Sequence, residues 1–217
     1  MPSRALGHEV RWDARTELFD ARRQRRDRAL LVLLHGAGTD RSQWTAIGLD
    51  HARTAAAQQR NGAAPVVLTP DLPAHPSDRA EERFLAADLL PLARRCFGAT
   101  DDPAKRAVGG ISIGGRIALE VAARRPDLFR AVGGHSPAVH TTDAERLAAA
   151  LANDHAAVQL DTGDGDGFRP GTEALAAALR RRGVAVSLRI APGGHDRRYW
   201  RRQLPGYLLR YFATTGS

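Results

Sequence analysis

Short apolar runs recur along the chain, and most are followed by a loop that contains glycine or proline and then by a segment with helical periodicity. The run 29–34 (ALLVLL) has no polar residue, which indicates a strand buried on both of its faces. Strands that alternate with helices form a mostly parallel sheet with helices on both faces. In such sheets the functional residues lie just after the carboxyl ends of the strands, so we expect candidate residues in those loops.

This alternation continues along most of the chain. The predicted strands cover residues 29–34, 65–68, 107–111, 131–134, 157–161 and 184–190. The predicted helices cover residues 42–59, 81–97, 113–125, 171–182 and 197–212. Pro91 lies inside the second of these helices and is expected to kink it. With 217 residues, of which 43% are hydrophobic, we expect one α/β domain over residues 1–217 and no general disorder.

The positive charge of the chain comes almost wholly from arginine. Of 32 basic residues only Lys105 is a lysine, and the formal net charge is +8. Arginine makes bidentate contacts with anions, so nucleic acid, acidic lipid and acidic substrates are conceivable partners. However, the arginines are spread along the chain, which favours a generally basic surface over a specific nucleic-acid site.

The single cysteine and the absence of long apolar stretches limit the possible classes of protein further. Cys96 alone cannot form an internal disulfide or a cysteine-cluster metal site, and its apolar surroundings (LLPLARRCF) predict a buried thiol. No stretch approaches 18 apolar residues, and the N-terminal residues have no apolar core like that of a signal peptide. We therefore expect a cytoplasmic protein without membrane contact, and the sequence does not indicate an oligomeric state.

The segment 110–115 (GISIGG) lies between a predicted apolar strand and an alanine-rich helical segment. A serine at a sharp turn from strand to helix, with glycines two residues to either side, is typical of an exposed nucleophile in acyl transfer. The glycines remove side chains that would collide with the neighbouring strand and helix. Ser112 is therefore the candidate nucleophile. The alternative is a glycine-rich turn that happens to contain a serine.

A second loop, residues 35–38 (HGAG), follows the first predicted strand and is a candidate for the oxyanion hole. We expect the backbone N–H groups of Ala37 and Ile113 to bind the oxyanion, and Ile113 also begins a helix, whose dipole favours negative charge. Gly38 and Trp44 are the candidate substrate-binding residues. Trp44 follows the candidate oxyanion loop and could border the acyl pocket. His35 is expected to be a structural histidine that bonds to the backbone.

Three aspartates compete for the role of triad acid in the segment 161–166 (DTGDGD). Asp166 is preferred, because the Gly-x-x-Asp turn lets its carboxylate bend back toward a histidine; Asp164 is the next choice, and Asp161 lies closest to the strand. The same stretch could instead form a calcium loop, although a threonine stands where the first carboxylate belongs. The residues of that calcium loop would be Thr162, Asp164, Asp166, Gly167 and Glu173.

His195 follows two glycines after the last predicted strand, in the segment 191–196 (APGGHD). In this setting an imidazole can swing toward Ser112 and take its proton, as a general base must. The chain order of serine, aspartate and histidine is that of the α/β-hydrolases. Such chemistry requires no metal and no organic cofactor. The other histidines lack a comparable setting and are interpreted as surface or structural groups: His8, His51, His75, His135, His140 and His155.

Over residues 30–212 the chain resembles the esterase D family of serine esterases, which includes feruloyl esterase-like, acetyl esterase-like and S-formylglutathione hydrolase-like members. The resemblance is carried by three segments, LLHGAGTDRSQW, GGISIGGRIALEVAARRPDLFRAVGGHSPA and GGHDRRYWRRQLPGYLLRYF. It implies an α/β-hydrolase fold with Ser112, Asp166 and His195 as the triad. The chain departs from the family in its shorter N-terminal region, and it has little between residues 136 and 154 to serve as a lid.

Together these features predict a hydrolase that acts on small or aryl carboxylic esters through an acyl-enzyme. Its partner is then a small-molecule ester, without specific nucleic acid. A thioesterase, an acyltransferase or a peptide hydrolase could use the same triad. A non-catalytic protein that holds an anion with its arginines on a hydrolase fold is the alternative from a different class.

Overall fold

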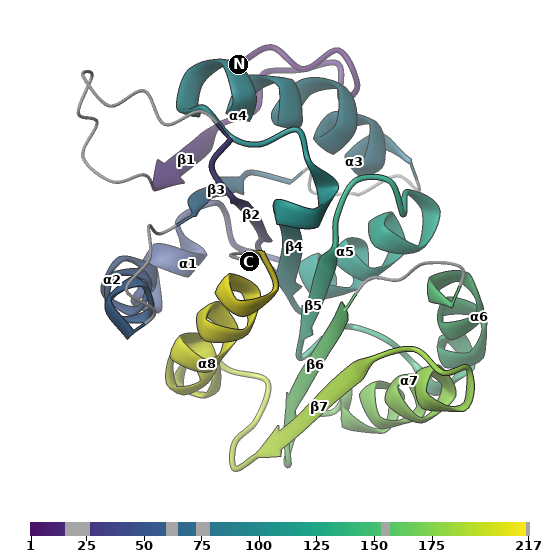
Figure 1. Ribbon diagram of the computed structural model, residues 1–217. Helices are drawn as coiled ribbons and strands as arrows, with labels where there is room; N and C mark the ends of the chain where they lie inside the picture. The colour runs from purple at the N-terminus through teal and green to yellow at the C-terminus, as the bar shows by residue number, and fades with distance from the viewer. Residues whose placement is uncertain (16–26, 60–64, 73–78, 153–156, 216–217) are drawn as a thin grey trace.

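The computed structural model describes residues 1–15, 27–59, 65–72, 79–152 and 157–215, and its centre is a seven-stranded sheet (Figure 1). The strand order is β1-β3-β2-β4-β5-β6-β7. Among the strands of the described residues, β1 alone runs antiparallel to its neighbour. The strands are β1 (Trp12–Arg15), β2 (Leu30–Leu34), β3 (Val66–Pro70), β4 (Arg106–Ile111), β5 (Ala131–His135), β6 (Ala157–Gly163) and β7 (Val186–Ala191).

Helices cover both faces of this sheet (Figure 1). One layer contains α1 (Gln43–Ala46), α2 (Leu49–Gln59) and α8 (Arg197–Thr215). The other contains α3 (Ala80–Arg83), a π-helical turn η1 (Phe84–Leu89), α4 (Leu90–Phe97), α5 (Ile113–Arg124), α6 (Thr141–Leu151) and α7 (Arg169–Arg181). A short 3₁₀ turn, η2 (Pro103–Lys105), precedes β4. Within the described residues, no helix combines the length and the apolar character that a membrane span requires.

The position of β2 in the interior of the sheet explains why its sequence contains no polar residue. Its side chains point alternately to the two faces, as the pleat of a strand requires. Leu30, Val32 and Leu34 pack among the residues of the α3–α7 layer, whereas Leu31 and Leu33 pack toward α1, α2 and α8. The predicted sheet, mostly parallel and covered by helices on both faces, is thus confirmed.

Two of the predicted helices are interrupted. The helix predicted over residues 42–59 is divided into α1 and α2 at Gly48, whose φ of +101° no helical residue adopts. The helix predicted over residues 81–97 is interrupted by the π-helical turn η1, and α4 begins directly after it with Pro91 in its first turn. A proline disfavours regular α-helix in the turn before it, and a π-helical turn is a known cause of a kink, so the irregularity expected from Pro91 lies at η1.

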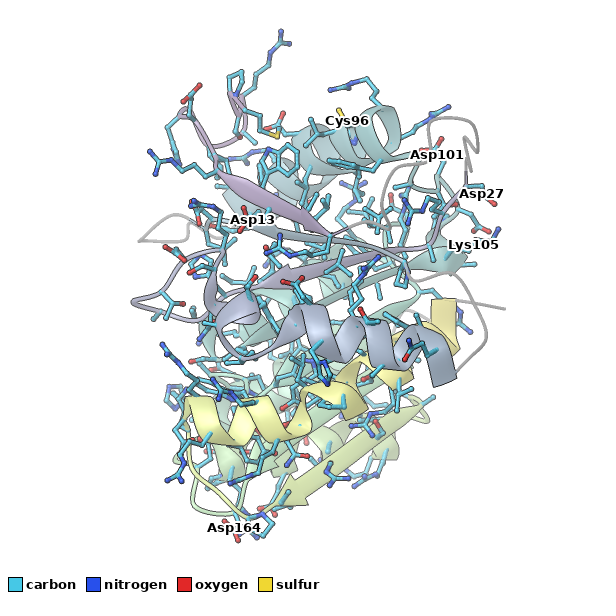
Figure 2. All side chains as sticks on the ribbon, turned by 90° about the vertical axis from the view of Figure 1, so that its left-hand side faces the viewer. Asp13, Asp27, Cys96, Asp101, Lys105 and Asp164 are labelled. Atoms are coloured by element: carbon cyan, nitrogen blue, oxygen red, sulfur yellow. The ribbon has the colours of Figure 1, made fainter. Side chains whose placement is uncertain are left out.

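The expectation that Cys96 is a buried thiol is wrong, because its side chain is exposed on α4 (Figure 2). Leu90 and Ala93 mark the buried face of this helix. Each step of three residues falls about 60° short of a full helical turn, so the second step carries Cys96 away from that face. The fourth residue after Ala93, Phe97, returns to it and packs against the core.

Besides the short turn η2, two elements have no counterpart among the predicted ones. The edge strand β1 has only four residues, and all of them are half-buried. The second element, α6, occupies the segment in which the sequence offers little to serve as a lid. Leu147, Ala148 and Leu151 of α6 pack into the core beside α5 and α7, so this segment is a core helix.

Candidate active site

The loops after β4, β6 and β7 bring Ser112, Asp166 and His195 together at one edge of the sheet. The Ser112 hydroxyl lies 2.9 Å from Nε2 of His195, and Nδ1 of His195 lies 2.9 Å from Oδ2 of Asp166. Both distances are those of hydrogen bonds, so a proton can pass from the hydroxyl to the imidazole. The three residues that the sequence singles out as a triad thus form one continuous hydrogen-bonded chain.

The backbone of Ser112 is strained and held from two sides. Its φ of +57° lies in the left-handed region, which L-residues rarely adopt. The N–H of Ser112 donates to the carbonyl of His135 at 3.0 Å, and the N–H of Ala138 donates to the carbonyl of Ser112 at 3.0 Å. These bonds tie the turn between β4 and α5 to the end of β5, and they keep the hydroxyl above the sheet.

Gly110 and Gly114 are required by the close approach of backbone within this turn. A methyl group on Gly110 would overlap the backbone of Gly114, and one on Gly114 would overlap the carbonyl oxygens of Leu34 and His35. The interpretation that these glycines make room for strand and helix is therefore confirmed. The same contacts also place the loop after β2 directly beside the nucleophile.

Replacing Gly114 with alanine is expected to lower the free energy of unfolding by about 3 kcal/mol, because the new methyl group meets backbone that cannot move aside. The matched control is Gly206→Ala in α8, where a methyl group has no neighbour closer than 3.7 Å. That change is expected to stabilise the protein by about 0.5–1 kcal/mol, since alanine is the better helix former. Urea unfolding of both variants measures the difference, and equal stability of the two would contradict this account.

Asp166 is the carboxylate that contacts His195, and its side chain has no exposed surface. Its second oxygen, Oδ1, accepts a hydrogen bond from the N–H of Phe168 at 2.9 Å. Burial by itself raises the pKa of the Asp166 carboxyl. The hydrogen bonds from His195 and from the Phe168 N–H outweigh it, and the pKa lies below its ordinary value. Asp166 therefore carries a negative charge at neutral pH.

Asp164, the second choice for the acid, contacts the loop of His195 and not its ring. It lies at the outer edge of the molecule, and its Oδ1 accepts the N–H of Gly193 at 3.0 Å (Figure 2). The N–H of Gly165 donates in turn to the carbonyl of Gly193 at 2.9 Å. The two loops that carry Asp166 and His195 are thus bonded to each other, which fixes the separation of acid and base.

The calcium alternative finds no support in this geometry. Asp166 is directed at His195, Asp164 at Gly193, and Glu173 forms an ion pair with Arg169. Among the described residues, no group of three or more histidine, cysteine or acidic side chains could hold a metal ion.

The imidazole of His195 lies close to two aromatic rings. The centroid of Phe168 is 5.2 Å from that of His195, and the centroid of Trp200 is 5.1 Å away with its ring nearly perpendicular. The His195 side chain remains 30% exposed, so a ligand can reach it. Sequence reasoning did not identify Phe168 or Trp200, because their contact with His195 exists only in the folded loops. Their sole local signal is their position close to Asp166 and His195.

The loop after β2 is held by a set of hydrogen bonds around Gly36. The N–H of Gly36 donates to Oε1 of Gln43 at 2.8 Å, and its carbonyl accepts from the hydroxyl of Thr39 at 2.7 Å and from Nδ1 of His35 at 2.9 Å. Nε2 of His35 accepts the N–H of Leu72 at 2.8 Å. The prediction of a structural histidine bonded to backbone is confirmed for His35, whereas Gln43 was not identified from the sequence.

This arrangement orients the next peptide group. Carbonyl and N–H point in opposite directions across a trans peptide, so the Gly36 carbonyl turns the N–H of Ala37 away from His35. A methyl group on Gly36 would lie 3.4 Å from Cβ of Ser112, which places this loop beside the nucleophile. Ile113 is the first residue of α5, so its N–H has no acceptor within that helix. Gly38, with a φ of +69°, is exposed at the turn that follows.

The expectation that Trp44 borders the acyl pocket is corrected, because its side chain has no exposed surface. Its Nε1–H donates to the carbonyl of Leu34 at 3.2 Å, and its ring meets that of His135 edge-on. Trp44 therefore supports the end of β2 from beneath. It follows the loop in sequence, but α1 turns it into the core.

Comparison with known proteins identifies the class of this chain. The sheet, its two helical layers and the turn that carries Ser112 define an α/β-hydrolase fold. The profile of the putative esterase family matches residues 30–211, which is most of the chain. The chain belongs to this family, whose members are carboxylic ester hydrolases, as its resemblance to the esterase D family implied. A search of curated proteins gives no match.

Solved structures of esterases are similar over nearly the whole chain. A ferulic acid esterase has 20% sequence identity and a TM-score of 0.82, with 98% of this chain and 96% of that chain covered. The S-formylglutathione hydrolase of Staphylococcus aureus has 14% identity and a TM-score of 0.81, with 97% and 96% covered. The enterobactin esterase of Shigella flexneri has 21% identity and a TM-score of 0.80, with 99% and 58% covered. At these identities the likeness establishes the fold.

Proposed function

We propose that the protein is a serine esterase in which Ser112 is the nucleophile, His195 the general base and Asp166 the carboxylate that orients the imidazole. The observation that carries this proposal is the unbroken hydrogen-bonded chain from the Ser112 hydroxyl through His195 to the buried Asp166. A serine hydroxyl is a weak nucleophile on its own, and a base oriented by a third group activates it.

The reaction proceeds through an acyl-enzyme in two steps. Ser112 attacks the ester carbonyl while Nε2 of His195 takes its proton, and the N–H groups of Ala37 and Ile113 hold the oxyanion. His195 then gives this proton to the leaving alcohol. Water attacks the acyl-enzyme by the same route and releases the acid. Asp166 keeps the proton of the neutral ring on Nδ1, which leaves Nε2 free to accept, and it stabilises the imidazolium.

For the substrate we propose small or aryl carboxylic esters. The half-buried ring of Phe168 lies beside His195 and meets the ring of the exposed His140 at 5.5 Å, so an aromatic surface reaches from the base toward solvent. Aromatic rings favour edge and offset contacts with one another. Two structural neighbours are also connected with aromatic compounds, because one is a ferulic acid esterase and the structure of the other, the enterobactin esterase, was determined in the presence of 2,3-dihydroxy-N-benzoyl-serine.

Labelling with a fluorophosphonate probe, followed by mass spectrometry of the peptides, tests the assignment of the nucleophile. We expect one modified residue, Ser112, with labelling that competes with p-nitrophenyl acetate. Heat-denatured protein is the control, because the probe reacts only with a serine activated by its base. Modification at another serine, or a folded protein that takes up no label, would contradict the proposal.

A substrate panel separates the ester hydrolase from enzymes that share its triad. Acetyl, hydroxycinnamoyl and benzoyl esters, a thioester with the same acyl group and the matching amide are compared by kcat/KM. A thioester preferred to its matched ester would favour the thioesterase alternative.

The anion-binding alternative predicts salt-dependent retention on heparin together with no fluorophosphonate label. It has little support, since many arginines form ion pairs with acidic side chains, as Arg41, Arg124 and Arg182 do.

A further inference from the structure

Below the proposed site lies a buried carboxylate that the reaction does not use. Asp161, near the end of β6, is 1% exposed and accepts hydrogen bonds from three side chains. Oδ1 lies 2.6 Å from Nδ1 of His135, and Oδ2 accepts the hydroxyls of Tyr199 at 2.9 Å and Tyr207 at 2.6 Å. These donors come from two elements, β5 and α8. Asp161 therefore joins three elements of the fold at one point.

This cluster is built into the packing of the sheet. Burial, together with the charge of Asp161, raises the pKa of the Tyr199 and Tyr207 hydroxyls well above the ordinary value, so both remain protonated donors. Nε2 of His135 lies 2.9 Å from the hydroxyl of Tyr211. A methyl group on Gly109 or Gly133 would overlap that hydroxyl, so two neighbouring strands leave room for it. A buried polar network of this kind is stabilising when its members are satisfied.

One end of the cluster reaches the nucleophile. The carbonyl of His135 accepts the N–H of Ser112 at 3.0 Å, so the residue whose ring bonds to Asp161 also holds the strained turn. The N–H of Ser136 donates to the carbonyl of Asp161 at 2.8 Å. Movement of Asp161 relative to β5 would therefore change the position of the Ser112 backbone.

The other end reaches the general base. Tyr199 lies in the first turn of α8, four residues after His195, and its N–H donates to Asp196 at 2.9 Å. The ring of Tyr199 lies beneath Gly193, where a methyl group would be 2.9 Å from Cδ2 of Tyr199. The bond from Tyr199 to Asp161 thus anchors the start of α8 and the loop that carries His195. Tyr207 bonds to the same oxygen from two turns farther along the helix.

We propose that Asp161 is a positioning residue, which sets the distance between Ser112 and His195 by holding the His135 end of β5 and the Tyr199 end of α8 on one carboxylate. The inference rests on the proposed function of Ser112 and His195. A displacement of about 1 Å between reacting groups can lower the rate by about 100-fold, so a rigid anchor between nucleophile and base has a direct effect on turnover.

The pair Tyr199→Phe and Tyr207→Phe tests the proposal. Each change removes one hydroxyl bond to the same oxygen of Asp161 from a buried tyrosine, so a purely structural role predicts equal effects. We expect both variants to unfold about 4 °C lower. Tyr199→Phe should also lower kcat about tenfold with KM unchanged and slow fluorophosphonate labelling to the same extent. Tyr207→Phe should lower kcat less than about threefold. Asp161→Asn is a poorer test, because it alters the contacts with His135 and with both tyrosines at once.

The measurements are made on the full chain, with activity corrected for the folded fraction. Equal kcat losses in the two variants, or an unchanged kcat and labelling rate in Tyr199→Phe, would overturn the proposal. A change confined to KM would do the same, since positioning of nucleophile and base acts on the chemical step. A parent protein that takes up label at Ser112 while the two variants behave alike contradicts only this inference. A parent labelled elsewhere contradicts the proposed function itself.

Discussion

Ser112→Ala is expected to lower kcat toward p-nitrophenyl acetate by about 10⁵- to 10⁶-fold, with little change in KM. Alanine removes the only atom that forms the acyl-enzyme in the proposed mechanism, and the hydrogen bond to His195 is lost with it. What remains is binding and the oxyanion donors, which by themselves accelerate hydrolysis by about 10³- to 10⁴-fold over water. The loss corresponds to about 7–8 kcal/mol of transition-state stabilisation.

The measurement uses initial rates and fluorophosphonate labelling on variants matched for folded fraction. Ser187→Ala is the control, because Ser187 is exposed on β7 and the same hydroxyl-to-methyl change there should leave kcat at the parent value. Circular dichroism should give the same secondary structure for both variants. Substantial hydrolysis by purified Ser112→Ala, at even a tenth of the parent rate, would remove this serine from the mechanism.

The features that the sequence predicted well are those with a local physical cause. A strand buried on both faces needs an unbroken apolar run, and β2 has one. The turn around Ser112 needs small residues where backbone meets backbone, so Gly110 and Gly114 identify it in the sequence. The loops after β4, β6 and β7 end at one edge because parallel strands share a direction. This is why three residues far apart in the chain could be predicted to converge.

The features that the sequence did not predict depend on contacts between distant segments. The orientation of Cys96 follows from which face of α4 meets the sheet, and an apolar neighbourhood does not specify it. Trp44 could border a pocket or fill the core, and only the direction of α1 decides between them. The partners of His135 could not be predicted, since Asp161 and Tyr211 lie 26 and 76 residues away. Among competing aspartates, turn geometry favoured Asp166, but no pattern assigned a separate role to Asp161.

Asp166→Asn is expected to lower kcat by about 10³- to 10⁴-fold while the fold is retained. The amide can present its NH₂ to Nδ1 of His195, so the imidazole takes the tautomer with the proton on Nε2 and cannot accept from Ser112. The negative charge that stabilises the imidazolium is lost as well. Asp166 is fully buried and bonded to both His195 and the Phe168 N–H, so the neutral isostere keeps its place in the loop and changes only charge and proton position.

Asp164→Asn is the matched control for this change, two residues away in the same loop. Oδ1 of the asparagine can still accept the N–H of Gly193, and the exposed side chain does not touch the imidazole, so kcat should change by no more than about twofold. Both variants are compared by kcat and by the rate of fluorophosphonate labelling, with thermal unfolding as the check on folding. A large loss in Asp164→Asn with a small one in Asp166→Asn would assign the acid to Asp164. In that case the contact between Asp166 and His195 in the resting structure would not be the one that operates in the reaction.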